Sequence, residues 1–244
     1  MEKRIQLLDI ALDSVSTKDA VECTVRYLEE EGSRVVYLVN SETLFLLKKE
    51  QEWKSLVAES ELILPANANV SASIDHVLGH KRESFFLESY IDAVLDYSIE
   101  MGHEMLIVAE NESKFTFMQE SIHEKRPLVT ISGVYMTETE QSLGHIVNEI
   151  NSVAPDILLF ALNEQEQLTI LKQYRNQINA GLMLFTGNTL YNQAVSESQV
   201  PQSIEKLKIG NLYKWFRMGG RWKAFWANVK IKFHLKQLGK EDDE

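Results

Sequence analysis

The sequence predicts an α/β fold: a Rossmann-like, mostly parallel sheet flanked by helices, with a basic, aromatic-rich helical appendage at the C-terminal end. Short apolar runs alternate with amphipathic runs of helical length, as in parallel strands joined by right-handed helical crossovers. The run Asp156-Ile-Leu-Leu-Phe-Ala161 is apolar after its first residue, as expected for a strand buried on both faces. The charge changes sign near residue 206, so we expect an α/β domain over residues 1–205 and an appendage over residues 206–244.

The starts and ends of several elements can be predicted from single residues. Ser16 can cap a helix because its hydroxyl accepts a hydrogen bond from a backbone N–H group of the first turn. Gly32 and Gly102 can end helices because glycine adopts the left-handed conformation at little steric cost. We expect strands at residues 5–10, 34–40, 61–64, 104–109, 127–131, 156–161 and 181–185. We expect helices at residues 16–31, 42–49, 53–58, 71–78, 85–101, 113–123, 138–152 and 165–178.

The composition indicates a globular protein of a reducing compartment. The chain has 244 residues, of which 44% are hydrophobic, so it can bury a full core. Its single cysteine, Cys23, excludes an internal disulfide. The first residues lack an apolar run of signal-peptide length, and no run of about 18 apolar residues occurs. We therefore expect a cytoplasmic protein that is soluble or bound peripherally to a membrane.

The net charge of −11 hides a strong asymmetry. Residues 206–240 contain ten Lys and Arg and no acid, whereas residues 1–205 contain 15 bases and 32 acids, a charge of −17. The last four residues add a further −4. This split indicates that the basic segment has a partner of its own.

Apolar residues of the basic segment recur at steps of three and four, so they share one side of a helix or of two helices hinged at Gly219-Gly220. One interpretation is a helix packed on the core with a solvated basic face. The interpretation we favour is a surface helix that inserts aromatic rings among lipid headgroups while its bases pair with anionic lipid, each base contributing ~1 kcal/mol. Nucleic acid is a weaker alternative because the acidic body repels phosphate. The expected membrane contacts are Trp215, Phe216, Trp222, Lys223, Phe225, Trp226 and Lys230.

Residues 61–70, Glu-Leu-Ile-Leu-Pro-Ala-Asn-Ala-Asn-Val, predict a buried strand that delivers a loop to a ligand site. In open α/β sheets, ligands bind outside the carboxyl ends of the strands. After the strand come Ala66, Asn67, Ala68 and Asn69, and none of these can act as an acid, a base or a nucleophile near neutral pH. The centre of the expected site therefore lacks catalytic chemistry.

The order of several short motifs resembles the WecG/TagA/CpsF glycosyltransferase family, from the first strand to about Trp222. Val39-Asn-Ser-Glu42 stands where the family has Thr-Pro-Asn-Pro-Glu, and Leu62-Ile-Leu-Pro-Ala-Asn67 stands where it has an apolar strand and Pro-Asp-Gly. The remaining matches are Pro155-Asp-Ile-Leu-Leu-Phe-Ala-Leu162 before the family's Pro-Lys-Gln-Glu, Thr186-Gly-Asn-Thr189 at its late glycine loop, and Leu212-Tyr-Lys-Trp-Phe216 at its Trp-Leu-Tyr-Arg-Leu.

The resemblance implies an inverting, metal-independent transfer of an N-acetylmannosamine-type sugar from a UDP donor to a lipid-linked acceptor at the cytoplasmic membrane face. It implies no cofactor. The aspartate of Pro-Asp-Gly is the presumed general base, which takes the proton of the acceptor hydroxyl. Ala66 occupies that position here, and a methyl group cannot accept a proton.

Other departures from the family pattern lie in the same expected site. Its Thr-Gly-x-Asp falls at Phe86-Leu-Glu-Ser89 and is absent. Of its Gly-x-Gly-x-Pro-Lys-Gln-Glu, only Gln167 is kept and the lysine is Glu166, a reversal of charge. Tyr191 stands where an aspartate follows the late loop. Together these changes indicate that donor binding and catalysis have been relaxed.

Each candidate residue has a structural alternative. Asn40 could hold substrate hydroxyls or cap the next helix, and Glu88 could replace the lost base or be a solvated carboxylate. Glu42 is the third catalytic candidate. The pair His76 and His80, beside Asp75, lacks a convincing third ligand, so we expect no metal site. The expected substrate-binding residues are Asn40, Asn67, Asn69, Gln167, Gly187, Thr189, Arg217 and Arg221.

The sequence thus predicts a glycosyltransferase-family protein, peripheral on the inner face of the cell membrane, in surface polysaccharide or teichoic acid assembly. We expect it to be catalytically degenerate and to act as a non-catalytic partner of an active glycosyltransferase. The alternative is an active inverting enzyme with a rebuilt site. The expected partners are a UDP-sugar or lipid-linked sugar, an anionic membrane surface, and an active glycosyltransferase or a second copy of the chain, but not nucleic acid.

Overall fold

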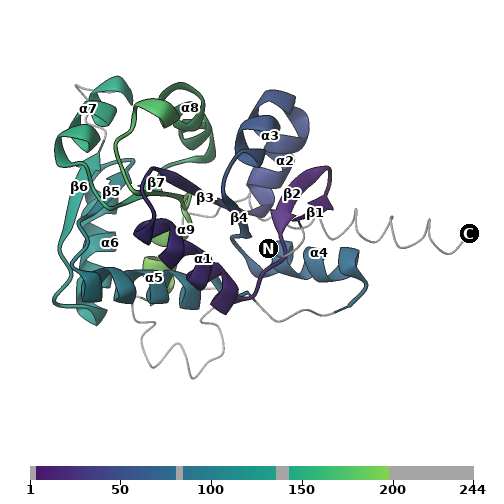
Figure 1. Ribbon diagram of the computed structural model, residues 1–244, viewed down its shortest axis with the longest axis horizontal. Helices are drawn as coiled ribbons and strands as arrows, with labels where there is room; N and C mark the ends of the chain where they lie inside the picture. The colour runs from purple at the N-terminus through teal and green to yellow at the C-terminus, as the bar shows by residue number, and fades with distance from the viewer. Residues whose placement is uncertain (1–3, 81–84, 136–142, 198–244) are drawn as a thin grey trace, which may run out of the picture.

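Six parallel strands form the central sheet, in the spatial order β4-β3-β8-β7-β5-β6 (Figure 1). The structure is a computed structural model that describes residues 4–80, 85–135 and 143–197. The predicted α/β class with a parallel sheet is confirmed, and the predicted appendage lies outside the described residues. The strands are β3 (Arg34–Val39), β4 (Leu62–Pro65), β5 (Met105–Ala109), β6 (Ile131–Tyr135), β7 (Ile157–Ala161) and β8 (Leu182–Phe185).

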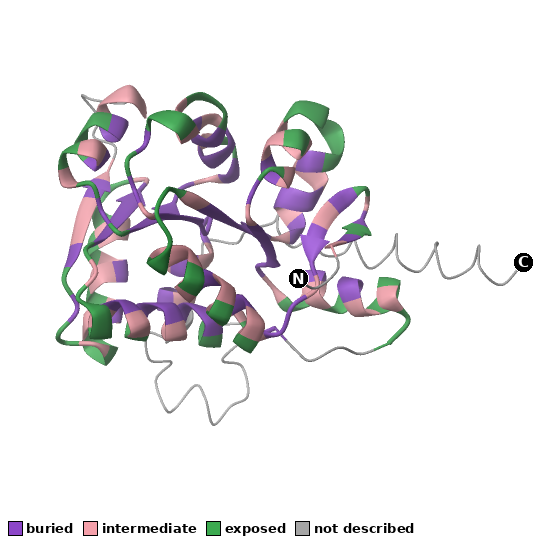
Figure 2. Cartoon of the chain, in the orientation of Figure 1, coloured by how far each residue is buried: buried purple, intermediate pink, exposed green. Residues whose placement is uncertain are grey.

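Helices cover both faces of this sheet. Successive strand residues point to opposite faces, so an apolar strand contributes residues to the core on each side. In β3, Val35, Tyr37 and Val39 belong to one core, whereas Val36 and Leu38 belong to the other. Figure 2 shows buried strands between helices with exposed outer surfaces. The first core contains residues of α2 (Ser41–Lys49), α3 (Gln51–Ala58), α4 (Ala68–Leu78), α7 (Leu143–Val153) and α8 (Glu164–Tyr174), and the second those of α1 (Thr17–Glu29), α5 (Leu87–Met101), α6 (Glu112–Lys125) and α9 (Thr189–Glu197). A short 3-10 helix (Arg175–Gln177) continues α8.

Asparagine caps four of the helices that follow strands. In each case the Oδ1 atom accepts backbone N–H groups of the first helical turn, which have no partner within the helix. Because these helices begin just after parallel strands end, the four amides lie at the carboxyl edge of the sheet. The capping residues are Asn40 for α2, Asn67 for α4, Asn111 for α6 and Asn163 for α8.

The strand predicted at residues 5–10 is instead the start of an antiparallel hairpin. Strand β1 (Arg4–Leu7) pairs with β2 (Ile10–Asp13) across a two-residue turn. Leu8 and Asp9 in this turn have φ values of 53° and 62°. Positive φ at both central residues matches the right-handed twist of a hairpin, and aspartate tolerates that conformation well. The prediction of one strand was wrong because this turn contains no glycine.

Other boundaries also differ from the prediction. The strand expected at residues 127–131 begins only at Ile131, since Pro127 and Leu128 form a turn. Helix α4 begins at Ala68 rather than at residue 71, so Asn69 belongs to its first turn rather than to a loop. Helix α9 was not predicted, because Thr186-Gly-Asn-Thr189 indicated a glycine loop without a following helix. Residues 138–142 of the expected helix at 138–152 lie outside the described residues.

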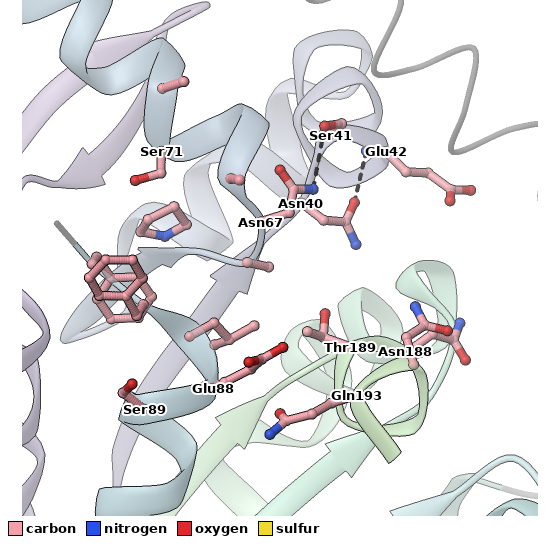
Figure 3. A pocket seen from close by; sticks show the side chains of 18 of the residues that line it. Asn40, Ser41, Glu42, Asn67, Ser71, Glu88, Ser89, Asn188, Thr189 and Gln193 are labelled. Atoms are coloured by element: carbon pink, nitrogen blue, oxygen red, sulfur yellow. Dashed lines mark hydrogen bonds between the residues drawn. The ribbon is translucent and has the colours of Figure 1, made fainter. Parts of the chain in front are cut away.

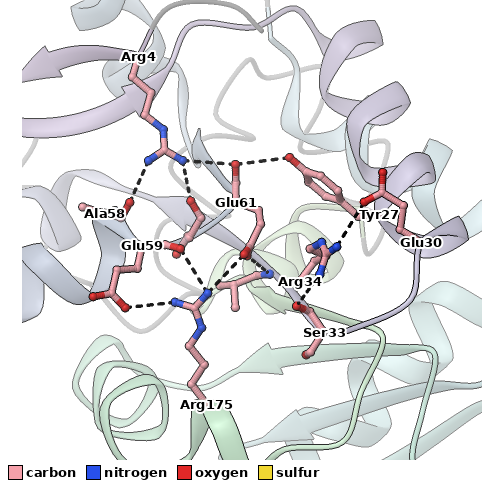
Figure 4. A network of polar contacts seen from close by, with 11 residues as sticks. Arg4, Tyr27, Glu30, Ser33, Arg34, Ala58, Glu59, Glu61 and Arg175 are labelled. Atoms are coloured by element: carbon pink, nitrogen blue, oxygen red, sulfur yellow. Dashed lines mark hydrogen bonds and ion pairs between the residues drawn. The ribbon is translucent and has the colours of Figure 1, made fainter.

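A network of charged groups joins the hairpin to the amino edge of the sheet (Figure 4). The charged side chains of this network are Arg4, Asp13, Glu61 and Arg175. Arg4 pairs with Asp13 at 3.0 Å and donates to the carbonyl oxygens of residues 58, 60 and 61. The Asp13 Oδ2 atom accepts the N–H of Ile63 at 2.7 Å. Glu61 accepts the N–H of residue 35 at 2.7 Å and lies 3.4 Å from Arg175.

Among the described helices, none has an apolar stretch of the length that crosses a bilayer.

Candidate functional site

A pocket of about 770 Å³ opens at the carboxyl edge of the sheet (Figure 3). Its walls come from the segments that follow β3, β4 and β8 and from the first turns of α4 and α5, which is where open α/β sheets bind ligands. The described residues that line it are Asn40, Ser41, Glu42, Pro65, Ala66, Asn67, Ala68, Ser71, Ala72, Asp75, Phe85, Phe86, Leu87, Glu88, Ser89, Asn188, Thr189, Asn192 and Gln193.

Asn40 links the pocket to the interior. Its Oδ1 atom accepts the N–H groups of Glu42 and Thr43 at 2.8 and 2.9 Å, so the capping role is present. Its Nδ2 atom donates to Glu164 Oε1 at 2.7 Å. With both ends of the amide engaged, this side chain is held in one orientation at the pocket wall.

Behind Asn40 lies a buried polar network that joins β3, α8 and β8. Glu164 is only 8% exposed, and its Oε2 atom accepts from Gln167 Nε2 at 3.2 Å. Gln167 Oε1 in turn accepts the N–H of Gly187 at 2.9 Å. Gly187 has a φ of 57°, a backbone conformation that favours glycine. A Cβ atom there would also lie only 2.8 Å from Glu164 Oε1, so a larger residue would clash with this carboxylate. Burial and the charge of Glu164 raise the pKa of Tyr37 well above its usual value.

The wall between β4 and α4 carries the position singled out in the sequence. Ala66 follows β4, lines the pocket and is 5% exposed, and its side chain is a single methyl group. Asn67 Oδ1 accepts the N–H of Val70 at 3.0 Å, which caps α4. The small side chains at the start of α4 leave the volume open and offer only amide and hydroxyl chemistry, whereas Asp75 farther along the helix adds a carboxylate.

Carboxylates and an aromatic ring complete the pocket. Glu42, Asp75 and Glu88 are the charged side chains among the described lining residues. Glu88 lies in the first turn of α5, and Figure 3 shows it reaching toward the side of the pocket formed by Thr189 and Gln193. Phe86 is 62% exposed, so its ring is available at the pocket wall. Carboxylates, amides and an exposed ring suit a ligand with many hydroxyl groups and an apolar face.

A second polar cluster adjoins the pocket at Asn188. Lys114 of α6 donates to Asn188 Oδ1 at 3.2 Å, pairs with Glu110, and lies 5.2 Å from the centre of the Tyr191 ring. Burial, followed by the nearby Glu110 charge, raises the pKa of Glu166. The sequence reasoning missed Lys114, Glu110 and Asn188, although Glu110 directly follows a predicted strand and could have been found from that position.

In the described part of the chain, no group of three or more His, Cys, Asp or Glu side chains is arranged to hold a metal ion. Asp75 lines the pocket, whereas His76 and His80 are exposed on and after α4.

A sequence model of the glycosyl transferase WecG/TagA/CpsF family matches residues 5–241. The chain belongs to this family. None of the curated proteins compared with it matches. The resemblance expected from the short motifs is therefore confirmed at the level of the family.

In this WecG/TagA/CpsF member, the structure brings together some of the predicted site residues. Asn40, Glu42, Asn67, Glu88 and Thr189 line the pocket with Ala66. Three others lie elsewhere: Gln167 and Gly187 form the buried network behind the wall, and Asn69 lies in the first turn of α4 without lining the pocket.

The family match extends into the basic segment, but that segment lies outside the described residues. The predicted substrate residues Arg217 and Arg221 belong to it. So do the predicted membrane contacts, Trp215, Phe216, Trp222, Lys223, Phe225, Trp226 and Lys230.

Proposed function

We propose that this protein is a non-catalytic glycosyltransferase-family member of bacterial surface polysaccharide or teichoic acid assembly. It binds an active glycosyltransferase, or pairs with a second copy of itself, and holds a sugar ligand in the pocket. The observation that carries this proposal is that Ala66, whose side chain is only a methyl group, lines an otherwise formed pocket. The resemblance expects the general base at this position.

The proposed ligand is the sugar of a UDP-sugar or of a lipid-linked intermediate. Sugar hydroxyls both donate and accept hydrogen bonds, so they can use the amides of Asn67 and Asn188 together with the carboxylates of Glu42 and Glu88. Ring C–H groups of a sugar can pack on Phe86. This set of groups binds a sugar without requiring any of them to take a proton from a nucleophile.

Co-purification from native membranes tests the proposed role as a partner. We expect the tagged full chain to retain an active glycosyltransferase of the same pathway or a lipid-linked sugar. Chain carrying a Glu42→Ala, Glu88→Ala double substitution serves as a control, because it alters the pocket and should lose the sugar but keep a protein partner. If neither enzyme nor lipid-linked sugar is retained by the unaltered chain, the proposal fails.

We also propose that residues 206–244 attach the protein peripherally to the inner face of the cell membrane. This rests on the ten bases and the aromatic spacing of residues 206–240. Liposome flotation with anionic vesicles tests it. Binding should disappear when residues 211–244 are deleted, and it should weaken with rising salt because exposed charges are screened. Equal flotation of the truncated chain would contradict it.

An active transferase is the second candidate, and the observation in its favour is that Glu88 and Glu42 both line the pocket. Either carboxylate could then act as the base. Turnover of a UDP-sugar with a polyprenyl-diphosphate acceptor, abolished by Glu42→Gln or Glu88→Gln, would establish this function and overturn the non-catalytic one.

The substitution Ala66→Asp gives a sharper test of how far catalysis has been lost. We expect no detectable turnover, because the family's Thr-Gly-x-Asp is absent at residues 86–89 and only Gln167 of its Gly-x-Gly-x-Pro-Lys-Gln-Glu is kept at residues 161–168. Thermal unfolding should first show that the variant is folded. Measurable product from this single change would show that those other losses do not matter.

A further inference from the structure

Strand β6 ends the sheet without the protection that β4 has at the other end. It is the last strand in the sheet order, opposite the end formed by β4 (Figure 1). Side chains of the N-terminal hairpin bond to the backbone at β4. The sequence of β6, Ile-Ser-Gly-Val-Tyr, contains no charged residue and no proline, which are the residues that commonly keep an end strand from adding another strand.

The pairing of the inner strands shows which backbone groups of β6 point outward. The carbonyl oxygen of Glu104 accepts the N–H of Ile157 at 3.1 Å, so the backbone groups of Glu104 point toward β7. Successive residues of a strand point these groups to alternate sides, so those of Ile107 point toward β6. Ile107 lies opposite Gly133, and in a parallel pair it bonds to the two neighbours of that residue. The N–H and C=O groups of Gly133 therefore point away from the sheet.

A side-chain contact agrees with this direction. Among the described residues, Gln119 of α6 reaches this edge, and its Nε2 atom donates to the carbonyl oxygen of Ile131 at 3.1 Å. Ile131 is two residues before Gly133, so both residues point their backbone groups to the same side. A carbonyl oxygen has two lone pairs, so that of Ile131 can accept a second hydrogen bond.

Gly133 is covered on one face of the sheet by the ring of Phe115. A Cβ atom at Gly133 would overlap this ring, so the ring fills the place of a side chain. Phe115 also stacks on Tyr135, with the ring centres 6.2 Å apart, and both residues are partly exposed. The outer edge of β6 thus combines unpaired backbone groups of glycine with two aromatic rings.

This edge is complementary to a second copy of itself. If two β6 strands pair antiparallel about Gly133, the two glycines form a hydrogen-bonded pair with Cα atoms about 5.5 Å apart. The Phe115 rings that cover them are then separated by a similar distance, which is within the range of favourable aromatic contacts. Ile131 lies opposite Tyr135 in this register, and such pairs of a β-branched and an aromatic residue stabilise sheets. No charged side chain of β6 opposes another.

We propose that β6 is a self-association surface, on which β6 of a second copy pairs antiparallel about Gly133 and joins the two sheets into one. The pairing lies at the end of the sheet, so the pocket at its carboxyl edge stays with each copy. The inference rests on the proposed function only in that a second copy is one of the two protein partners named there.

Disulfide cross-linking tests the pairing and its register. In the proposed dimer, Ser132 lies opposite Val134 of the second copy in a non-hydrogen-bonded pair with Cα atoms about 4.5 Å apart, a separation that suits a disulfide. The full chain is prepared with Cys23→Ser and either Ser132→Cys or Val134→Cys. Oxidation of an equal mixture should give a cross-linked dimer. A mixture of Val134→Cys with Ser55→Cys, at an exposed position of α3, is the control and should give none.

Sedimentation equilibrium of the full chain gives a second measurement. Ser132→Lys places a charge on the edge strand and should raise the dimer dissociation constant at least about tenfold. Ser55→Lys adds the same charge on α3 and should leave it unchanged, once thermal unfolding shows that both variants are folded.

Three results would overturn the inference: a monomeric unaltered chain, equal dissociation constants for the two lysine variants, or no cross-link in the mixture of Ser132→Cys and Val134→Cys. A monomeric chain that still retains an active glycosyltransferase from membranes would overturn this inference alone and leave the proposed function standing.

Discussion

The carboxylates at the two edges of the sheet have different neighbours. At the amino edge, Asp13 and Glu61 each meet an arginine and a backbone N–H group. At the carboxyl edge, Glu164 accepts hydrogen bonds from the amides of Asn40 and Gln167, and burial together with the nearby charge of Glu110 raises the pKa of Glu166. The amino edge is thus arranged for stability, whereas the carboxyl edge keeps polar groups in less favourable surroundings, as binding sites commonly do.

The largest expected effect tests the amino edge. Asp13→Ala removes the partner of Arg4 and leaves the N–H of Ile63 without its acceptor, so we expect a loss of about 3 kcal/mol in the free energy of unfolding. Urea denaturation measures this. Gln6→Ala, at an exposed position of β1, is the control and should change the stability by less than about 0.5 kcal/mol. Similar losses in both variants would remove the distinction between the edges.

Asn40→Ala tests whether the carboxyl edge depends on more than a helix cap. The variant loses the cap of α2 and also a donor to the buried Glu164, so it should cost about 2 kcal/mol. Asn111→Ala is the matched control, since Asn111 caps α6 from an exposed position, and it should cost about 1 kcal/mol. Equal costs, again from urea denaturation, would mean that the link between Asn40 and Glu164 does not stabilise the fold.

Gly187→Ala tests how closely the backbone approaches the buried network. Both Gly187 and Gly102 have positive φ, but an added Cβ meets Glu164 only at residue 187 and meets nothing within 4 Å at residue 102. Gly102→Ala should therefore cost about 1 kcal/mol, from backbone strain alone. Gly187→Ala should cost roughly 1 kcal/mol more. The difference in thermal unfolding between the two variants is the measurement, and no difference would show that Glu164 moves aside freely.

The smallest effect concerns the pH dependence caused by Glu166. Its raised pKa means that the folded state holds this proton more tightly than the unfolded state, so the contribution of Glu166 to stability falls as the pH rises from the ordinary glutamate pKa of 4.5 through the raised value. Glu166→Gln should be more stable than the unaltered chain at pH 7, and this advantage should shrink toward pH 4. A pH-independent difference in melting temperature would contradict this sign.

The sequence predicted the sheet better than it predicted the site. The strand Ile157–Ala161 is apolar throughout, and burial on both faces requires that pattern, so its position could be predicted from the run of apolar residues alone. The hairpin turn could not, because Leu8 and Asp9 adopt positive φ without a glycine. The placement of Ala66 in the pocket followed from the rule for strand ends. The contact of Lys114 with Asn188 joins residues 74 positions apart, which no local pattern encodes.

The N-terminal hairpin has a consequence for how this protein meets other copies of itself. Strand β4 is at one end of the sheet order, and an end strand offers backbone groups to which a strand of another molecule can add. Here the carboxylate of Asp13 accepts the N–H of Ile63, and the guanidinium of Arg4 donates to the carbonyl oxygens of residues 60 and 61. Side chains thus occupy hydrogen-bonding positions that a foreign strand would need, so the hairpin limits sheet extension and aggregation at this end.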